Sequence, residues 1–334
     1  LVGRVPELAA IAGLRAADLA GPVVIAVDGM PGAGKTAFAV RAAHLLVRGV
    51  LQGAVPFFAD LRGCAGERAP AEPSAVLDGF LRGLGSPPRV RLGRAGLADQ
   101  ADRFRRATAG RRALLLLDDA RSADQVLPLL PGHPGTVVLV TSRARLTGLR
   151  PSLSLRLGPL RPEASVDLLR TEIGAELVDA DLPSASTIAR LCGHLPLALT
   201  VCARRVRERP AWSLHDHRLR VAGTGLDEEV RAALAGSCVG LSAATASLLR
   251  LLAWCPGPGF DVPAGAALAG VAGEEAASGV HELVRRNLVL DVGDGRFVLN
   301  ELVRRFAQDA SWEADPATVR QEALRRLAEH HARA

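Results

Sequence analysis

The sequence predicts an α/β domain with a five-stranded parallel sheet, followed by two smaller domains built mainly of helices. One observation behind this is a set of apolar runs, at 23–27, 113–117 and 136–140, that read as strands buried on both faces. Another is a glycine-rich turn that joins the first run to a helix. After residue 158 the pattern changes from strands to helices with one late hairpin. A chain of 334 residues is long enough for two or three such domains.

The first domain is expected over 1–157, and its strands set the framework. A short apolar arm, 1–8, leads into a helix over 8–19 that precedes the strand at 23–27. Helices are expected at 75–84, with Ser74 as N-cap, and at 97–109. The other four strands are expected at 55–61, 113–119, 136–141 and 153–157.

Two helical regions follow. The first, 158–226, has expected helices at 163–174, 184–192 and 196–208, and ends in a linker over 211–226. The second, 227–315, has expected helices at 228–236, 242–254, 263–270 and 274–286, then a hairpin around 293–295. Helices with a terminal hairpin describe a winged helix. Residues 316–334 read as a C-terminal helix that leads into a further segment.

Composition narrows the class of protein. Half of the residues are apolar, yet no apolar run reaches membrane-spanning length and no signal-peptide pattern is present, so a cytoplasmic protein is expected. Because the chain starts at Leu1 rather than Met, we expect an excerpt of a longer protein. Five cysteines without C-x-x-C spacing favour buried thiols in a reducing compartment. The His215-Asp216-His217 run reads as a solvated polar turn rather than a metal site.

The turn after the first strand carries the clearest chemistry. Gly29-x-x-x-x-Gly34-Lys35-Thr36 matches the P-loop pattern between a strand and a helix. Gly32 and Gly34 let the backbone wrap closely around phosphate, Lys35 reaches the β- and γ-phosphates, and the Thr36 hydroxyl is placed for Mg²⁺. Lys35 is the single lysine of the chain. A compact ammonium therefore stands at the one place where a planar guanidinium would fit poorly.

Two later strands end in charged residues. The strand at 113–119 closes with Asp118 and Asp119, and we expect it to lie next to the P-loop strand. Asp118 would hold Mg²⁺ through water, and Asp119 would orient or deprotonate an attacking water. The strand at 136–141 is followed by Arg143, which could sense the γ-phosphate. A polar strand end and a solvated arginine are the plainer alternatives.

The order of the motifs resembles the NB-ARC module of signal-transduction (STAND) ATPases. The motifs are L-V-G-R-x-x-E-L, G-M-P-G-A-G-K-T, F-A-D-L-R-G, L-L-L-L-D-D-A, V-T-S-R-x-R-L, C-G-H-L-P-L-A-L and R-F-V-L-N-E-L-V-R-R-F-A. The residues of these motifs are most similar to those of the NB-ARC modules found in bacterial SARP-type transcriptional activators that regulate antibiotic production. The resemblance covers residues 1–315. It implies a sheet ordered as in AAA+ ATPases and three domains that close around ADP and open when ATP replaces it.

The resemblance also implies residue roles. Val2 and Arg4 would line the adenine site, and Gly32 to Ala37, including Ala33, would hold the phosphates. Pro196, with Leu197 beside it, would pack on the adenine from the helical lid. The family's Met-His-Asp motif is replaced here by Leu299-Asn300-Glu301. Asn300 can donate a hydrogen bond to ADP but cannot become a cation, so we expect a weaker lock on ADP or a lock supplied elsewhere. A plain helix N-cap is the alternative role for Asn300.

Three functions compete. The first is an ATP/ADP switch with slow hydrolysis that controls effector and sensor segments of a longer chain, with ATP-driven homo-oligomers as a further expectation. The second is a metabolic P-loop enzyme such as a kinase, for which no second catalytic cluster is visible. The third is a winged-helix DNA-binding ATPase of the origin-recognition type. The net charge of 227–334 is −4, and Glu274, Glu275 and Glu282 lie on its expected recognition helix, which argues against direct DNA binding. A GTPase is disfavoured because N-K-x-D needs a second lysine.

Overall fold

The computed structural model describes residues 1–63, 69–86, 94–257 and 259–333. The chain folds into two compact units. The first unit comprises Leu1–Gly29 and Gly34–Gly158, and the second comprises Met30–Ala33 and Pro159–Ala334. The expected division of the chain into three domains and a C-terminal helix stays a prediction. Cys64, one of the expected thiols, lies outside the described residues.

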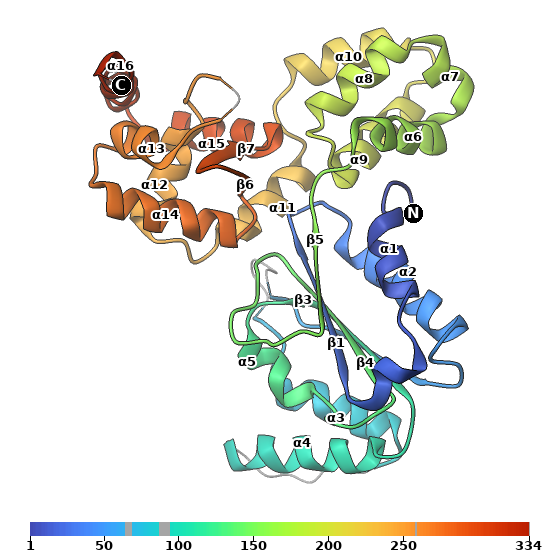
Figure 1. Cartoon of the computed structure of the whole chain (residues 1–334). Coiled ribbons are helices and arrows are strands. Elements are labelled where there is room, and N and C mark those ends of the chain that lie inside the picture. The colour runs from blue at the N-terminus through green and yellow to red at the C-terminus, as the bar shows by residue number, and fades with distance from the viewer. Residues whose placement is uncertain (64–68, 87–93, 258, 334) are drawn as a thin grey trace. The chain divides into compact units, whose positions relative to one another are not determined.

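The first unit is built around a five-stranded parallel sheet, as predicted (Figure 1). Its strands have the order β2-β3-β4-β1-β5. The prediction that the strand ending in Asp118 lies next to the P-loop strand is therefore wrong, because β4 lies between β3 and β1. The strands are β1 (Val23–Gly29), β2 (Val55–Asp60), β3 (Ala113–Ala120), β4 (Thr136–Ser142) and β5 (Leu153–Leu157).

Helices cover both faces of this sheet, which explains why its central strands are apolar on both sides. Alternate residues of β3, such as Leu115 and Leu117, share a core cluster with a triad of aromatic rings, Phe57, Phe80 and Phe104. Helix α2 packs against β1, β3 and β4, and Figure 1 shows it on the side of the sheet opposite α5. The helical elements are α1 (Val5–Ala12), η1 (Ala16–Ala20), α2 (Lys35–Arg48), α3 (Pro73–Gly83), α4 (Arg94–Thr108), α5 (Ala123–Val126) and η2 (Leu127–Leu129).

The N-terminal helix differs from the prediction of one helix over 8–19. It begins earlier, at Val5, because Pro6 fits the first turn of a helix. It ends at Ala12, where the N–H of Gly13 donates to the Ala9 carbonyl at 2.9 Å, and a separate 3₁₀ turn follows. A proline also moves the start of α3, whose N-cap is Glu72 rather than Ser74 because Pro73 occupies the first turn.

In the described part of the second unit, the first five helices after residue 159 pack mainly on α6 and α8. Helix α6 packs on α7, α8 and α9, and α10 packs on α8. The linker expected at 211–226 is wrong, because most of it forms α10, started by a capping box between Ser213 and Asp216. These helices are α6 (Pro162–Ile173), α7 (Ala175–Ala180), α8 (Leu182–Leu191), α9 (Pro196–Glu208) and α10 (Leu214–Gly223).

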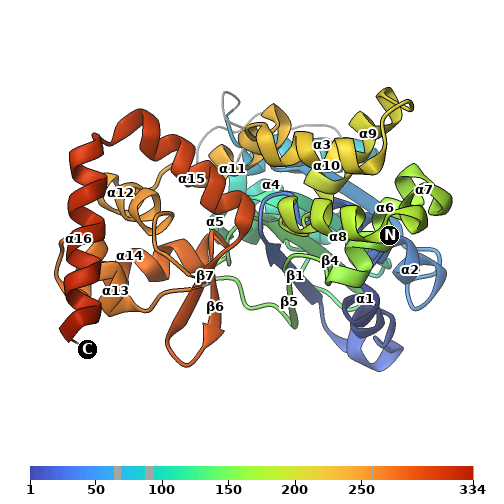
Figure 2. The same ribbon diagram turned by 90° about the horizontal axis from the view of Figure 1, so that it is seen from above.

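The rest of the second unit, over its described residues, forms six helices and a two-stranded antiparallel hairpin. Helix α12 packs on α13, α14 and α15, strand β6 contacts α14, and α16 runs alongside α13 (Figure 2). Asp315 closes α15, and its carboxylate accepts hydrogen bonds from both Nε and Nη2 of Arg250 on α12. The elements are α11 (Glu228–Cys238), α12 (Ala243–Leu252), α13 (Val262–Ala269), α14 (Gly273–Arg285), β6 (Val289–Gly293), β7 (Arg296–Leu299), α15 (Glu301–Ala314) and α16 (Ala317–Arg333).

Within the described ranges, no helix combines the length and the apolar character needed to cross a membrane. The four cysteines in those ranges are free thiols. Cys192, Cys202 and Cys255 are buried, as expected, whereas Cys238 is only partly buried.

Candidate nucleotide-binding site

The predicted phosphate loop connects the end of β1 to the start of α2. Gly32 and Gly34 have φ values of +77° and +83°, a left-handed conformation that glycine adopts without strain. Gly29 is needed for a different reason, since a Cβ there would lie 2.2 Å from the carbonyl oxygen of Leu157 on β5. Helix α2 begins at Lys35, so Thr36 and Ala37 belong to its first turn, where helices bind anions.

The Lys35 ammonium folds back over this loop. Its Nζ donates to the Gly29 carbonyl oxygen at 2.8 Å. This bond anchors the only lysine of the sequence at the mouth of the loop, next to the N-terminus of α2. The Ala33 N–H donates to the Met30 carbonyl at 3.1 Å, which closes the turn between the two elements.

A three-residue cluster lies at the carboxyl edge of the sheet. The Thr36 hydroxyl is 3.0 and 2.8 Å from the two carboxylate oxygens of Asp118, and the Thr141 hydroxyl donates to Asp118 Oδ1 at 2.5 Å. Asp118 is only 8% exposed. Hydroxyl and carboxylate oxygens are the ligands that Mg²⁺ prefers, so this donor set fits the predicted metal. Among the described residues no group of three or more His, Cys, Asp and Glu side chains could hold a metal.

Asp119 lies beside this cluster and has a strained backbone conformation. Its φ is +53°, and the pairing of β3 with β4 shifts register between Leu117 and Ala120. The Asp119 N–H donates to the Thr141 hydroxyl at 2.9 Å, and its Oδ1 lies 3.4 Å from Nε of Arg143. The structure therefore brings together both carboxylates and the arginine that the sequence singled out. A strained backbone of this kind recurs at functional sites.

Sequence reasoning missed several residues of this edge. The Thr141 hydroxyl bonds to both Asp118 and the Asp119 backbone N–H. The only sequence signal for this role was the position of Thr141 at the polar end of an apolar strand, just before Ser142. Asp28, the residue before the last one of β1, has its Oδ1 at 3.4 Å from Nε of Arg156 on β5. Gly63 approaches β3 so closely that a Cβ would lie 2.5 Å from the Asp119 carbonyl oxygen. The carboxyl edge of the sheet thus holds an additional ion pair, Asp28–Arg156, that the sequence motifs do not indicate.

Of the two proposed adenine residues in the first unit, Val2 and Arg4, Arg4 already has protein partners. Arg4 is 5% exposed, donates to the Gly158 carbonyl at 2.6 Å and lies 3.5 Å from Glu7. Burial lowers the pKa of its guanidinium. Arg4 therefore fastens the N-terminal arm to the end of the β5 strand segment, with Val2 half-buried beside it in sequence.

The proposed lid residues stand at the start of α9, in the second unit. Leu197 donates its N–H to the Gly32 carbonyl at 3.1 Å, and its Cβ would lie 3.0 Å from a Cβ on Gly32. Met30–Ala33 groups with the second unit. Pro196 occupies the first turn of the helix, as its fixed φ allows.

Asn300 is 8% exposed and both ends of its amide have protein partners. Its Oδ1 accepts from the Leu302 N–H at 3.0 Å and so caps α15, which agrees with the N-cap alternative. Its Nδ2 donates to the Gly193 carbonyl at 2.8 Å. A Cβ on Gly193 would lie 2.4 Å from Asn300 Oδ1, so only glycine fits opposite this side chain.

No family model matches the chain. The chain is 37% identical over 329 residues to the regulatory protein AfsR of Streptomyces griseus, which covers 94% of the chain and 33% of the relative. It is 35% identical over 296 residues to AfsR of Streptomyces coelicolor, covering 85% of the chain and 29% of the relative. The predicted resemblance to bacterial regulatory proteins is confirmed. The chain spans about a third of the length of these curated relatives.

Solved structures agree on the fold. The Walker-type ATPase PABY2304 of Pyrococcus abyssi matches with a TM-score of 0.55 at 13% identity, over 85% of this chain and 91% of that one. The ORC2 protein of Aeropyrum pernix matches with a TM-score of 0.56 at 15% identity, over 99% of this chain and 96% of that one. The first unit has the P-loop NTPase fold. At these identities the likeness concerns the fold alone.

Proposed function

We propose that the chain is an NB-ARC-type switch that binds ADP or ATP and controls a longer regulatory protein. The observation that carries the proposal is the Thr36–Asp118 pair beside Lys35, an arrangement of hydroxyl, carboxylate and ammonium suited to a magnesium nucleotide. The likeness to AfsR proteins supports a role in regulation. The Aeropyrum ORC2 protein, of similar fold, was solved as ADPNP and ADP complexes.

In this proposal the loop residues hold the phosphates, with Lys35 on the β- and γ-phosphates. When bound, Mg²⁺ would neutralise phosphate charge, with the Thr36 hydroxyl as a ligand and Asp118 holding the ion through water. Thr141 holds Asp118 and Asp119 at their present positions. Val2, Arg4, Pro196 and Leu197 would line the adenine.

The Asp119–Arg143 pair suggests how the state of the nucleotide is sensed. The two groups lie 3.4 Å apart and are each about a fifth exposed, so the pairing is accessible to competition by another anion. A γ-phosphate offers Arg143 a more highly charged partner than one carboxylate does. Drawing Arg143 away would release Asp119 to orient a water for slow hydrolysis. Loss of the γ-phosphate restores the original pair.

Asn300 is proposed to act on the nucleotide by positioning rather than by direct contact. Its amide already bonds to Gly193 and caps α15, so it connects α15 to the Gly193-His194-Leu195-Pro196 segment that leads into α9. His194 is itself held by Ser165, at 3.0 Å from its Nδ1. Displacing Asn300 would loosen the segment that carries the proposed lid residues.

The remaining architecture is assigned within the same proposal. We assign α6–α10 to the helical lid and α11–α15, with the β6–β7 hairpin, to the winged-helix domain. Helix α16 would lead to the next segment of the longer regulator. ATP-driven assembly of several copies would be the output of the open state. The free thiols support placement in the cytoplasm.

A DNA-binding role is the main competitor, and the contacts of Arg286 oppose it. This arginine follows α14, the helix that would read DNA, yet it bonds to the carbonyls of Val239 and Gly240 and pairs with Glu282. Its guanidinium is used to hold α11 rather than offered to phosphate. The acidic residues Glu274 and Glu275 lie in the first turn of the same helix.

The proposal is tested by denaturing the purified protein and identifying any released nucleotide by chromatography. Bound ADP at near one equivalent per chain, with turnover of added ATP slower than about one per minute, supports the switch. Brisk ATP turnover would favour a metabolic enzyme instead. A salt-sensitive shift of duplex DNA by the chain would favour the DNA-binding alternative.

A further inference from the structure

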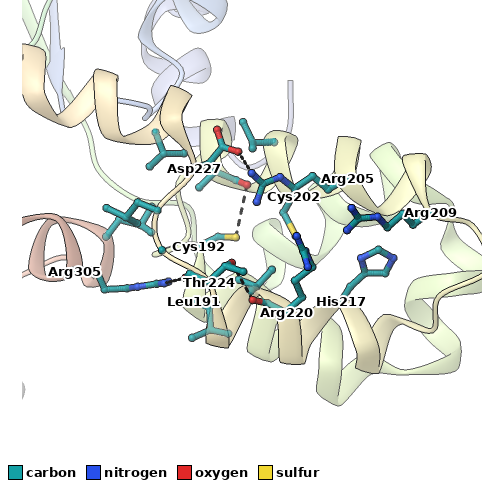
Figure 3. A pocket seen from close by; sticks show the side chains of 17 residues that line it. Leu191, Cys192, Cys202, Arg205, Arg209, His217, Arg220, Thr224, Asp227 and Arg305 are labelled. Atoms are coloured by element: carbon teal, nitrogen blue, oxygen red, sulfur yellow. Dashed lines mark hydrogen bonds and ion pairs between the residues drawn. The ribbon is translucent and has the colours of Figure 1, made fainter. Parts of the chain in front are cut away.

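A pocket lies within the second unit, away from the phosphate loop in sequence, between helices α8–α10 and helices α11 and α15 (Figure 3). It is a cleft with an open mouth, and its cavity volume is about 60 Å³. None of the residues assigned to the nucleotide lines it. Its walls therefore need a separate explanation.

The floor of the pocket is apolar. Ala198, Val201, Val230 and Leu302 are all buried and line it. Two thiols, Cys192 and Cys202, complete the floor. A hydrogen bond with Cys202 and burial raise the pKa of the Cys192 thiol, which keeps it neutral. A floor of this kind favours an apolar ligand body.

The rim has the opposite character. Four arginines line the pocket, Arg205, Arg209, Arg220 and Arg305, against one carboxylate, Asp227. Arg205 pairs with Asp227, and Arg305 donates to the Thr224 carbonyl at 2.6 Å. Arg209 and Arg220 make no ion pair with any described carboxylate; their guanidinium carbons lie 4.9 and 5.9 Å from the centre of the Trp212 ring. Figure 3 shows both arginines close to His217.

His217 provides an independent sign of a missing partner. It is 4% exposed, lines the pocket, and its Nε2 has no hydrogen-bond partner among the described residues. Buried polar atoms in proteins are nearly always satisfied, so such an atom in a pocket wall calls for a ligand or water. The expectation that the His215–His217 run is a solvated polar turn is wrong for His217, which α10 buries at 5.3 Å from the Trp212 ring.

We propose that this pocket binds a small amphipathic anion, with its apolar body on the floor and one carboxylate or phosphate head group at Arg209 and Arg220. The His217 imidazole supplies a further polar contact. Neither an apolar floor alone nor an arginine cluster alone would select this class; the two together do. The inference does not depend on the proposed nucleotide site, which uses other residues.

The test uses 8-anilinonaphthalene-1-sulfonate (ANS), an aromatic sulfonate whose fluorescence rises in apolar sites. We expect one saturable site per chain on the folded protein, with decanoate or decyl phosphate displacing ANS and decanol failing to do so. The stronger of the two anions identifies the head group. Arg209→Gln with Arg220→Gln is expected to weaken ANS binding about tenfold, the loss typical of a charge-assisted hydrogen bond. Arg204→Gln, on α9 and outside the pocket, is the matched control and should bind as the unmodified chain does.

His217→Phe separates a ligand contact from a structural role. It removes a buried nitrogen that has no partner, so the unfolding midpoint should hold or rise, while the affinity for decanoate falls about fivefold. Lys35→Ala should leave ANS binding intact, which distinguishes this site from the nucleotide site. Equal binding by the double variant and by Arg204→Gln, or displacement by decanol as strong as by decanoate, would overturn the proposal.

Discussion

Thr36, in the first turn of α2, donates its hydroxyl to both carboxylate oxygens of Asp118 at the end of β3, at 3.0 and 2.8 Å. The strands that lead to these residues are not neighbours, because β4 separates them. Thr141 of β4 fills the space between them and bonds to Asp118 at 2.5 Å. The cluster therefore depends on three strands rather than two.

Removing the Thr141 hydroxyl tests this cluster. Thr141→Val deprives Asp118 of a donor and the Asp119 N–H of its acceptor, so stability should fall by about 1–2 kcal/mol and Mg²⁺-dependent nucleotide binding by about tenfold. Thr136→Val, a buried threonine at the other end of β4, is the control. It should lower stability without changing the Mg²⁺ dependence. Urea unfolding and titrations with a fluorescent ADP analogue measure both; equal Mg²⁺ dependence in both variants would contradict the assigned role.

Lys35 should not tolerate replacement even by another cation. Lys35→Ala removes the ammonium, and Lys35→Arg replaces it with a planar group that does not fit a tight loop. Both should weaken binding of the fluorescent ADP analogue about a hundredfold while the far-ultraviolet circular dichroism stays unchanged. Arg48→Ala, at the far end of the same helix, is the control. Near-normal ADP binding by Lys35→Arg would contradict this expectation, because it would mean that any positive charge at this position is sufficient.

The regular elements could largely be predicted from the sequence, because buried parallel strands are continuous apolar runs and their ends are marked by polar residues. Strand β5 and helix α9 were predicted with the bounds that the structure has. The order of the strands could not be derived from the strands themselves, so the placement of Asp118 beside the P-loop strand was wrong. Helix α10 was missed because its short polar sequence gains its stability from burying Leu214 and His217.

The sequence predicted those site residues whose type is required by a recognisable motif. The P-loop glycines, Lys35 and Asp118 fall in this group. Thr141 was missed because a threonine in a strand has an ordinary packing role, and only the register of β3 and β4 shows that its hydroxyl faces Asp118. The two partners of the Asn300 amide were likewise beyond the sequence, since Gly193 is more than a hundred residues away.

A substitution of Asn300 can separate its two roles, which are capping α15 and bonding to the Gly193 carbonyl. Asn300→Asp keeps an acceptor for the Leu302 N–H but loses the donor to the Gly193 carbonyl, so about 2 kcal/mol of stability should be lost. If the link holds the lid segment, ADP release should accelerate more than ATP binding slows. Ser242→Ala, which removes the cap of α12, is the control and should cost about 1 kcal/mol with no effect on release. Stopped-flow fluorescence measures release; identical rates in both variants would refute the link.

Acid stability should depend on Asp315. Hydrogen bonds from Arg250 and Ser311 hold the pKa of its carboxyl below the usual value. Because the folded state binds the proton more weakly than the unfolded state, the stabilisation is present above about pH 4 and is lost as the pH falls through the lowered folded-state pKa. Asp315→Asn should cost about 2–3 kcal/mol at pH 7 and reduce the loss of stability at acid pH. Asp167→Asn, an exposed ion-pair partner, should change neither; equal acid sensitivity of Asp315→Asn and the unmodified chain would contradict this account.

Calorimetric titration of nucleotide-free protein with ADP, with and without Mg²⁺, shows whether the phosphate loop binds an adenine nucleotide. We expect saturable binding of one ADP per chain, strengthened by Mg²⁺, and competition by ATP but not by GTP. A protein that stays folded after nucleotide removal yet gives no heat with either ADP or ATP would contradict this expectation.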